Sequence, residues 1–375
     1  MNASLRALLA GSIDYAGMFP PAGLTLTEAI DRYRQYRGSQ ASWMLGRFVV
    51  PAAQNHPLTE ELLDAATITE ETAARDQYRS VLHRYLGTKD GGTGRKASSH
   101  APASDLASIY DSETDGRLIV IVPGAGSGAG VQNDLDQILA HITKSPLARA
   151  VDMLEFRWPA EFLQDANDSR LGNLVQTAAD QIVSSRLTPM TMFFELPRPK
   201  KNAVGGAHDA VRNCQIRAAV DALAEYNQAA RSLNCPAGFK LRCGGTAIGE
   251  IPSSAEVADA ICACRDRGVF WKATAGLHHP LRHTDPVWRV SVHGFLNLMS
   301  AAVLADVHHL DERQTQAVID ENDPRQFGFS DEALTWSEYS VPAEQIATAR
   351  GRSFRSFGSC SFDEPCDDLK VLGLM

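Results

Sequence analysis

Six short apolar runs recur along the chain, and most carry charged residues near the C-terminal end, with Pro or Gly closing the run. Parallel strands are buried on both faces and therefore consist of nearly continuous apolar residues. The stretches between successive runs have helical spacing, so the pattern predicts repeated βαβ units and a parallel sheet. The runs are residues 43–51 (WMLGRFVVP), 118–123 (LIVIVP), 151–159 (VDMLEFRWP), 190–197 (MTMFFELP), 238–245 (GFKLRCGG) and 269–276 (VFWKATAG).

Two further strands would complete a barrel. A seventh is predicted near Ile13, and the eighth is expected from residues 325–329 or 353–357. We therefore predict a (β/α)8 TIM-type barrel with an irregular C-terminal extension. The alternative is a doubly wound parallel sheet, which would need a nucleotide-binding fingerprint. The glycines of GAGSGAG, residues 124–130, fall at every second position and miss the G-x-G-x-x-G spacing.

The chain is expected to divide into a barrel over residues 1–310 and a C-terminal extension over 311–375 that packs on it. A helix is expected over 58–86. Residues 87–116 are rich in Gly, Ser, Ala and Asp and contain few large apolar residues, so they predict a mobile insertion within the barrel.

Composition narrows the class of partner. The net charge is −9, and the longest basic run is RPKK at 198–201, which argues against nucleic acid. No apolar run reaches the roughly 18 residues of a membrane span, and the first residues lack a signal-peptide core. Seven scattered cysteines fit a reducing compartment. We expect a cytoplasmic protein with no membrane partner and a possible homodimer.

Lys272 is the strongest catalytic candidate. A lysine inside an apolar strand must be ion-paired, exposed at the sheet edge, or lowered in pKa by desolvation, and an amine with a lowered pKa can form a Schiff base. The alternative is a structural ion pair or an anion anchor. The segment FWKATAG resembles the Lys-bearing strand of Schiff-base aldolase barrels, a resemblance that implies a lyase.

A cationic pair precedes this strand. Lys240 and Arg242 are two residues apart and share one face of a strand, while Gly244 and Gly245 permit close backbone approach to a ligand. This combination suits a substrate carboxylate or phosphate. The alternative is that both cations pair with carboxylates inside the barrel and the glycines only turn the chain.

The carboxylates in question are Glu155 and Glu195, which occupy comparable places in successive strands. Two carboxylates at adjacent strand ends can divide the roles of general acid and general base. Further candidate site residues lie after Lys272 and in other parts of the chain. The segment after Lys272 contains His278, His279, His283 and Arg282, and other runs contain Arg47 and Arg157. Asp14 and Tyr15, near the first predicted strand, are weaker candidates.

Three functions remain open. The first is a metal-independent lyase or aldolase that acts on a small anionic metabolite through Lys272, with Glu195, His278 or His279 moving protons. The second is a divalent-metal isomerase or hydrolase that uses Glu155, Glu195 and His278 or His279. The third is a non-catalytic barrel that binds a metabolite or a partner chain through structurally paired charges.

Overall fold

The fold is described from a computed structural model. The described residues are 2–52, 117–123, 127–143, 151–163, 169–187, 190–198, 207–229, 234–245, 247–285 and 288–375. The predicted helix over 58–86 and the predicted insertion over 87–116 lie outside these ranges, as do residues 124–126 of the Gly-rich segment.

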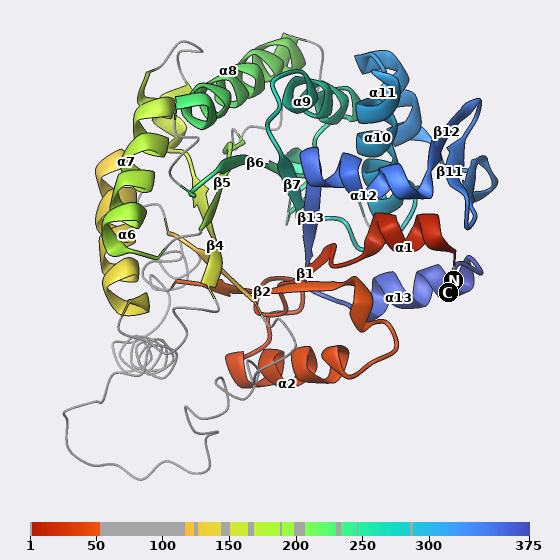
Figure 1. Ribbon diagram of the computed structural model, residues 1–375, viewed down its shortest axis with the longest axis horizontal. Helices are drawn as coiled ribbons and strands as arrows, with labels where there is room; N and C mark the ends of the chain where they lie inside the picture. The colour runs from red at the N-terminus through yellow and green to blue at the C-terminus, as the bar shows by residue number, and fades with distance from the viewer. Residues whose placement is uncertain are drawn as a thin grey trace.

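Eight parallel strands close into a barrel, which confirms the predicted fold class (Figure 1). Hydrogen bonding runs in the order β1-β13-β7-β6-β5-β4-β3-β2 and returns to β1, so the doubly wound alternative is wrong. The strands are β1 (Ile13–Tyr15), β2 (Leu45–Pro51), β3 (Leu118–Ile121), β4 (Val151–Arg157), β5 (Thr191–Glu195), β6 (Ala237–Arg242), β7 (Trp271–Thr274) and β13 (Phe354–Ser359).

The eighth strand comes from the second of the two expected segments. β13 pairs in parallel with β1 on one side and with β7 on the other. Residues 311–375, expected as an extension, therefore also supply the strand that closes the barrel. The other expected segment forms β10 in a small antiparallel sheet of β10 (Phe327–Phe329), β11 (Ala333–Trp336) and β12 (Tyr339–Pro342). A two-stranded ribbon joins β8 (His283–Thr284) to β9 (Ser291–Val292).

Helices surround the barrel (Figure 1). Successive helices α6, α7, α8 and α9 contact one another and cover β3 to β6, as the helical spacing between the apolar runs predicts. The helices are α1 (Ala3–Leu9), α2 (Leu26–Arg37), α6 (Gly128–Ile142), α7 (Arg170–Ser185), α8 (Ala207–Ala229), α9 (Ser254–Asp266), α10 (Phe295–His308), α11 (Glu312–Asp320), α12 (Ala343–Arg352) and α13 (Asp363–Val371). Short 3-10 segments are Ser42–Met44, Ala160–Leu163, Ile248–Glu250 and Pro324–Gln326.

A capping box in the sequence marks the residue at which α2 begins. Thr25 caps α2 by accepting a hydrogen bond from the Glu28 backbone, and the Glu28 side chain accepts one from the Thr25 backbone. From α2, Tyr33 packs on Phe48 of β2 with ring centroids 5.3 Å apart. The cap sets the residue at which α2 begins, and the aromatic contact holds α2 against β2.

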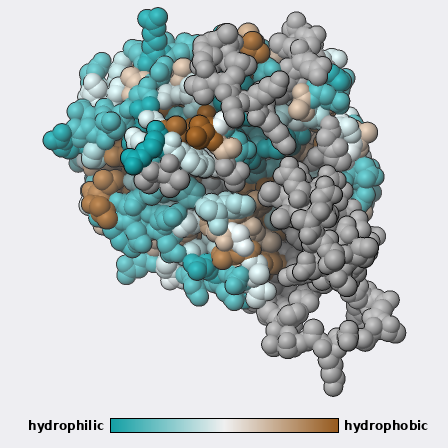
Figure 2. Space-filling view, turned by 180° about the vertical axis from the view of Figure 1, so that it is seen from behind, coloured by the Kyte–Doolittle hydropathy of each residue, from teal (hydrophilic) through white to brown (hydrophobic). Residues whose placement is uncertain are grey.

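The visible surface contrasts with the apolar core. On the face opposite that of Figure 1, hydrophilic residues cover most of the described surface, with hydrophobic residues in small separate patches (Figure 2). Among the described helices, none is long and apolar enough to cross a membrane.

Candidate functional site

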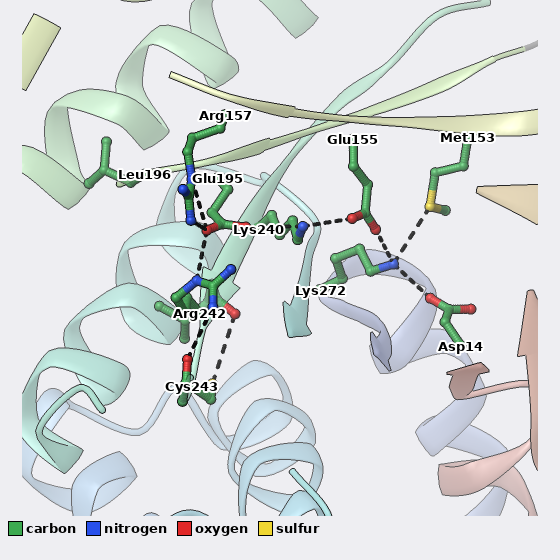
Figure 3. Close-up of polar contacts among 12 residues, drawn as sticks. Asp14, Met153, Glu155, Arg157, Glu195, Leu196, Lys240, Arg242, Cys243 and Lys272 are labelled. Atoms are coloured by element: carbon green, nitrogen blue, oxygen red, sulfur yellow. Dashed lines mark hydrogen bonds and ion pairs between the residues drawn. The ribbon is translucent and has the colours of Figure 1, made fainter. Parts of the chain in front are cut away.

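Charged side chains from five strands meet inside the barrel (Figure 3). Asp14, Glu155, Glu195, Lys240 and Lys272 come from β1, β4, β5, β6 and β7, and each is at most 5% exposed. Several of their contacts join strands that are not neighbours in the sheet, so these contacts cross the barrel interior. We call these five residues, with Arg157 and Arg242, the interior charge network.

Lys272 is held by two carboxylates. Its Nζ donates to Asp14 Oδ2 at 2.7 Å and to Glu155 Oε1 at 2.6 Å, and Met153 Sδ lies 3.9 Å away. Burial alone would lower the pKa of Lys272, but Asp14 and Glu155 raise it above the ordinary lysine value. The side chain is therefore an ammonium group in this arrangement, the ionised form that the ion-pair alternative requires.

Glu155 joins the two lysines. Its Oε1 accepts from Lys272, and its Oε2 lies 2.7 Å from the Nζ of Lys240. The two lysines are register partners on adjacent strands β6 and β7. Burial would raise the pKa of Glu155, but the charges of Lys240 and Lys272 outweigh it and lower the pKa to about 2.

Glu195 joins Lys240 to two arginines. Its Oε2 is 3.0 Å from Lys240 Nζ, while its Oε1 accepts from Arg242 Nε at 2.9 Å and from Arg157 Nη2 at 2.6 Å. Despite burial, these three cations hold the pKa of Glu195 well below its ordinary value. Glu195, Arg157 and Arg242 are the last residues of β5, β4 and β6, and the Arg157 side chain is 48% exposed. This end of the network is the one that reaches solvent, at the strand ends where barrel enzymes place their active sites.

Asp14 closes the other end of the network. Its Oδ2 also accepts from Ser356 Oγ of β13, and its Oδ1 accepts from the backbone N–H of Arg47. The Arg47 side chain itself makes a two-bond contact with Asp152, both bonds 2.8 Å long, so it is directed away from Asp14. Ser356 is the partner that sequence reasoning missed, because a lone serine in a weak strand pattern carries no signal.

An apolar cluster borders the network inside the barrel. Val49, Ile119, Met153 and Phe193 form a separate buried cluster of side chains from β2, β3, β4 and β5. The Lys272 ammonium lies 5.7 Å from the centroid of the Phe193 ring. This cluster offers Lys272 only an aromatic face and a thioether, so its hydrogen-bonding oxygens come from Asp14 and Glu155.

The predicted histidines lie elsewhere. His278 Nδ1 donates to Glu364 Oε2 at 2.8 Å, and His279 Nδ1 donates to Asp368 Oδ2 at 2.6 Å, so both histidines contact α13. Arg282 faces Asp320 of α11, with Nε 3.3 Å from Oδ1. None of the three has an interaction with the interior charge network among the contacts of the described residues.

The predicted glycines are required by close contacts within the protein. A Cβ on Gly244 would lie 2.7 Å from the Cα of Gly276, where the segments after β6 and β7 cross. A Cβ on Gly245 would lie within the Glu250 carboxylate. The carbonyl of Gly244 accepts from Arg242 Nη1 at 3.3 Å, so this crossing also positions an arginine of the network.

Metal ligands are not grouped in the described part of the chain, where no three or more His, Cys, Asp or Glu side chains could together hold an ion. In particular, His278 does not approach Glu155 and Glu195, the other members of the alternative metal set. The fold and the network define the protein as a (β/α)8 barrel with a buried charged site at the strand ends. Comparison with protein-family models, with curated proteins and with solved structures finds no match.

Proposed function

We propose that this barrel is a metal-independent enzyme that acts on a small anionic metabolite with a carbonyl group, using a network lysine as nucleophile. The observation that carries the proposal is the continuous row of ion pairs from Asp14 through Lys272, Glu155 and Lys240 to Glu195. Buried ion pairs are weak devices for stability, because desolvation offsets most of their attraction. A row of them beneath the mouth of a barrel is better explained by chemistry.

The solvent end of the network suits the substrate's anionic group. Arg157 and Arg242 share a single oxygen of Glu195, so both guanidinium groups keep donors that this carboxylate does not use. A carboxylate or phosphate bound there would place the rest of a small substrate over Lys240 and Lys272. Arginine forks are well matched to such anions.

The reaction requires a neutral amine. Because the pKa of Lys272 is raised, its proton must pass to Asp14 or Glu155, which already accept hydrogen bonds from it. The amine nitrogen then bonds to the carbonyl carbon, and the carbonyl oxygen leaves as water after protonation. The resulting iminium group accepts the electron pair of a breaking carbon–carbon or carbon–hydrogen bond. Glu155 is placed to return protons.

Trapping tests the proposal. The protein is incubated with pooled carbonyl metabolites and borohydride, and its intact mass is compared among wild type, Lys272→Met, Lys240→Met and the control Lys370→Met. Lys370 is a surface residue paired with Asp367, so its loss should leave trapping unchanged. We expect a mass increment in wild type and in the control that disappears in Lys272→Met. An increment that is lost only in Lys240→Met would move the nucleophile to β6.

A second candidate is a non-catalytic barrel that binds an anionic metabolite. It is favoured by the raised pKa of Lys272 and the lowered pKa of Glu155, which keep both groups in the charged, paired form. This candidate predicts no trapped product in any variant, together with binding of the anion that weakens in Arg242→Gln. Metal content measured on the same sample addresses the remaining alternative, since stoichiometric metal without trapping would favour an isomerase or hydrolase.

A further inference from the structure

A thiol, an imidazole and a carboxylate form a second row of polar groups outside the interior charge network. Cys360 directly follows β13, His278 follows β7, and Glu364 lies in the first turn of α13. The Cys360 Sγ and His278 Nε2 are 3.9 Å apart, and His278 Nδ1 donates to Glu364 Oε2 at 2.8 Å. Three segments separate in sequence thus place three reactive groups in line.

This order of groups is chemically specific. Glu364 accepts a hydrogen bond from Nδ1 and so fixes a proton there, which leaves Nε2 as the nitrogen that faces the thiol and can take up its proton. A nucleophile in contact with a base, which is itself oriented by a third group, is the arrangement that activates thiols and hydroxyls in covalent catalysis. The contact with Cys360, followed by that with Glu364, raises the pKa of His278 to about 9.

Among the contacts of the described residues, none of the other buried cysteines lies against a histidine. Burial raises the pKa of the Cys235 and Cys366 thiols to about 12, and it also raises that of Cys243. Cys214 is an exposed free thiol on α8 and has no contact with a histidine among the described residues. Cys360 is therefore distinguished by its partner and not by exposure, since the residue is only 8% exposed.

A buried hydroxyl lies in the same region. Tyr15 is fully buried, and its Oη has no hydrogen-bond partner among the described residues. Burial, followed by the charge of Tyr36, raises the pKa of Tyr15. Tyr15 is the register partner of Ser359, the residue before Cys360, so among the described residues its protonated phenol is an unused donor in the region of the thiol.

We propose that Cys360 is a nucleophilic thiol, activated by His278 and Glu364, that reacts with small uncharged electrophiles. With a haloacetamide, the Cys360 proton passes to His278 Nε2, the sulfur bonds to the methylene carbon, and the carbon–halogen bond breaks to release halide. Alkylation removes the Cys360 contact that contributes most to the raised pKa of His278, so the imidazolium then returns its proton to solvent. The limited exposure of Cys360 restricts the reaction to small reagents.

Iodoacetamide labelling at pH 7, followed by peptide mass spectrometry, tests this proposal on the full chain. We expect Cys360 to react about tenfold faster than Cys214, because His278 Nε2 takes up the proton that the Cys360 thiol loses. The variant His278→Gln should remove this advantage. His279→Gln is the matched control, because His279 also binds α13 through a carboxylate but contacts no thiol among the described residues.

The result that would overturn the proposal is a Cys360 rate no higher than that of Cys214 in wild type. Equal slowing in His278→Gln and His279→Gln would also overturn it, because loss of α13 contacts would then explain the effect. Unfolding curves of the three proteins establish that the variants remain folded. The labelling rate of Cys360 is measured without any carbonyl metabolite, so failure of the lysine chemistry and failure of this site are distinguishable.

Discussion

Individual charged residues in the barrel interior are stabilised only as a set. Glu155 accepts from two buried lysines, and each lysine also contacts a second carboxylate. Removal of one partner from a buried pair leaves an uncompensated charge in a region of low dielectric, which costs more than the intact pair contributes. The consequence of a substitution therefore depends on which charge is left without a partner.

Glu155→Gln should lower the free energy of unfolding at pH 7 by about 3 kcal/mol, because two ammonium groups lose their shared carboxylate. The pKa of Glu155 is lowered from 4.5 to about 2 in the folded protein. Its contribution is therefore complete above about pH 4.5 and is lost as the pH falls towards 2. Urea unfolding between pH 7 and pH 2.5 should show a shallower acid slope in the variant.

The exposed pair of Asp323 and Arg325 provides the comparison, since Asp323→Asn removes a carboxylate from a solvated pair. We expect this variant to change unfolding little at pH 7. If Glu155→Gln lowers the free energy of unfolding no more than Asp323→Asn does, the two buried lysines do not depend on their shared carboxylate.

At the scale of elements, the connections that follow β6 and β7 determine where the cationic end of the network lies. Their backbones cross at Gly244 and Gly276, and Gly276 has a φ of 73°, in the region that favours glycine. Arg242 donates to the Gly244 carbonyl just before the crossing. Close packing of two main chains thus sets the position of an arginine of the interior charge network, at the proposed substrate site.

Gly244→Ala should lower the free energy of unfolding by about 1 to 3 kcal/mol, because the new Cβ meets backbone atoms that cannot rotate away. Gly172→Ala in α7 is the control: nothing lies within 4 Å of its Cβ position. Alanine is favoured over glycine in a helix, so this change should stabilise by about 0.5 to 1 kcal/mol. Thermal and urea unfolding measure the change in the free energy of unfolding for both variants. If both variants are destabilised or both are stabilised, contact with the Gly276 backbone does not explain the effect of Gly244→Ala.

At the scale of the whole molecule, the last part of the chain closes the structure begun by the first. β13 lies between β1 and β7, and Ser356 of β13 contacts Asp14 of β1. Without β13, both neighbouring strands would expose unpaired backbone groups, which favours association between molecules. The barrel and the interior charge network therefore depend on residues at opposite ends of the sequence.

Removal of residues 354–375 should abolish the cooperative unfolding transition and cause aggregation, because β13 and α13 are lost together. Removal of Met375 alone, a partly exposed terminal residue, should leave the transition unchanged. Circular dichroism during urea unfolding and size-exclusion chromatography measure the two outcomes. A cooperative, monomeric product of the longer truncation would contradict a required role for β13.

The alternation of strands and helices could be predicted from the sequence alone, since burial on both faces produces continuous apolar runs that local inspection detects. All seven charged residues of the network were also candidates from the sequence, most of them because an ionisable group inside such a run is unusual. The sequence left two candidates for the eighth strand, and it could not distinguish an unpaired lysine from one bound by Asp14, 258 positions away. The choice of the eighth strand and the pairing of Lys272 became clear only from the tertiary structure. The contacts of His278 and His279 with α13 also became clear only there. The physical reason is that barrel closure and contacts across the interior depend on strand order and stagger, which local periodicity does not encode.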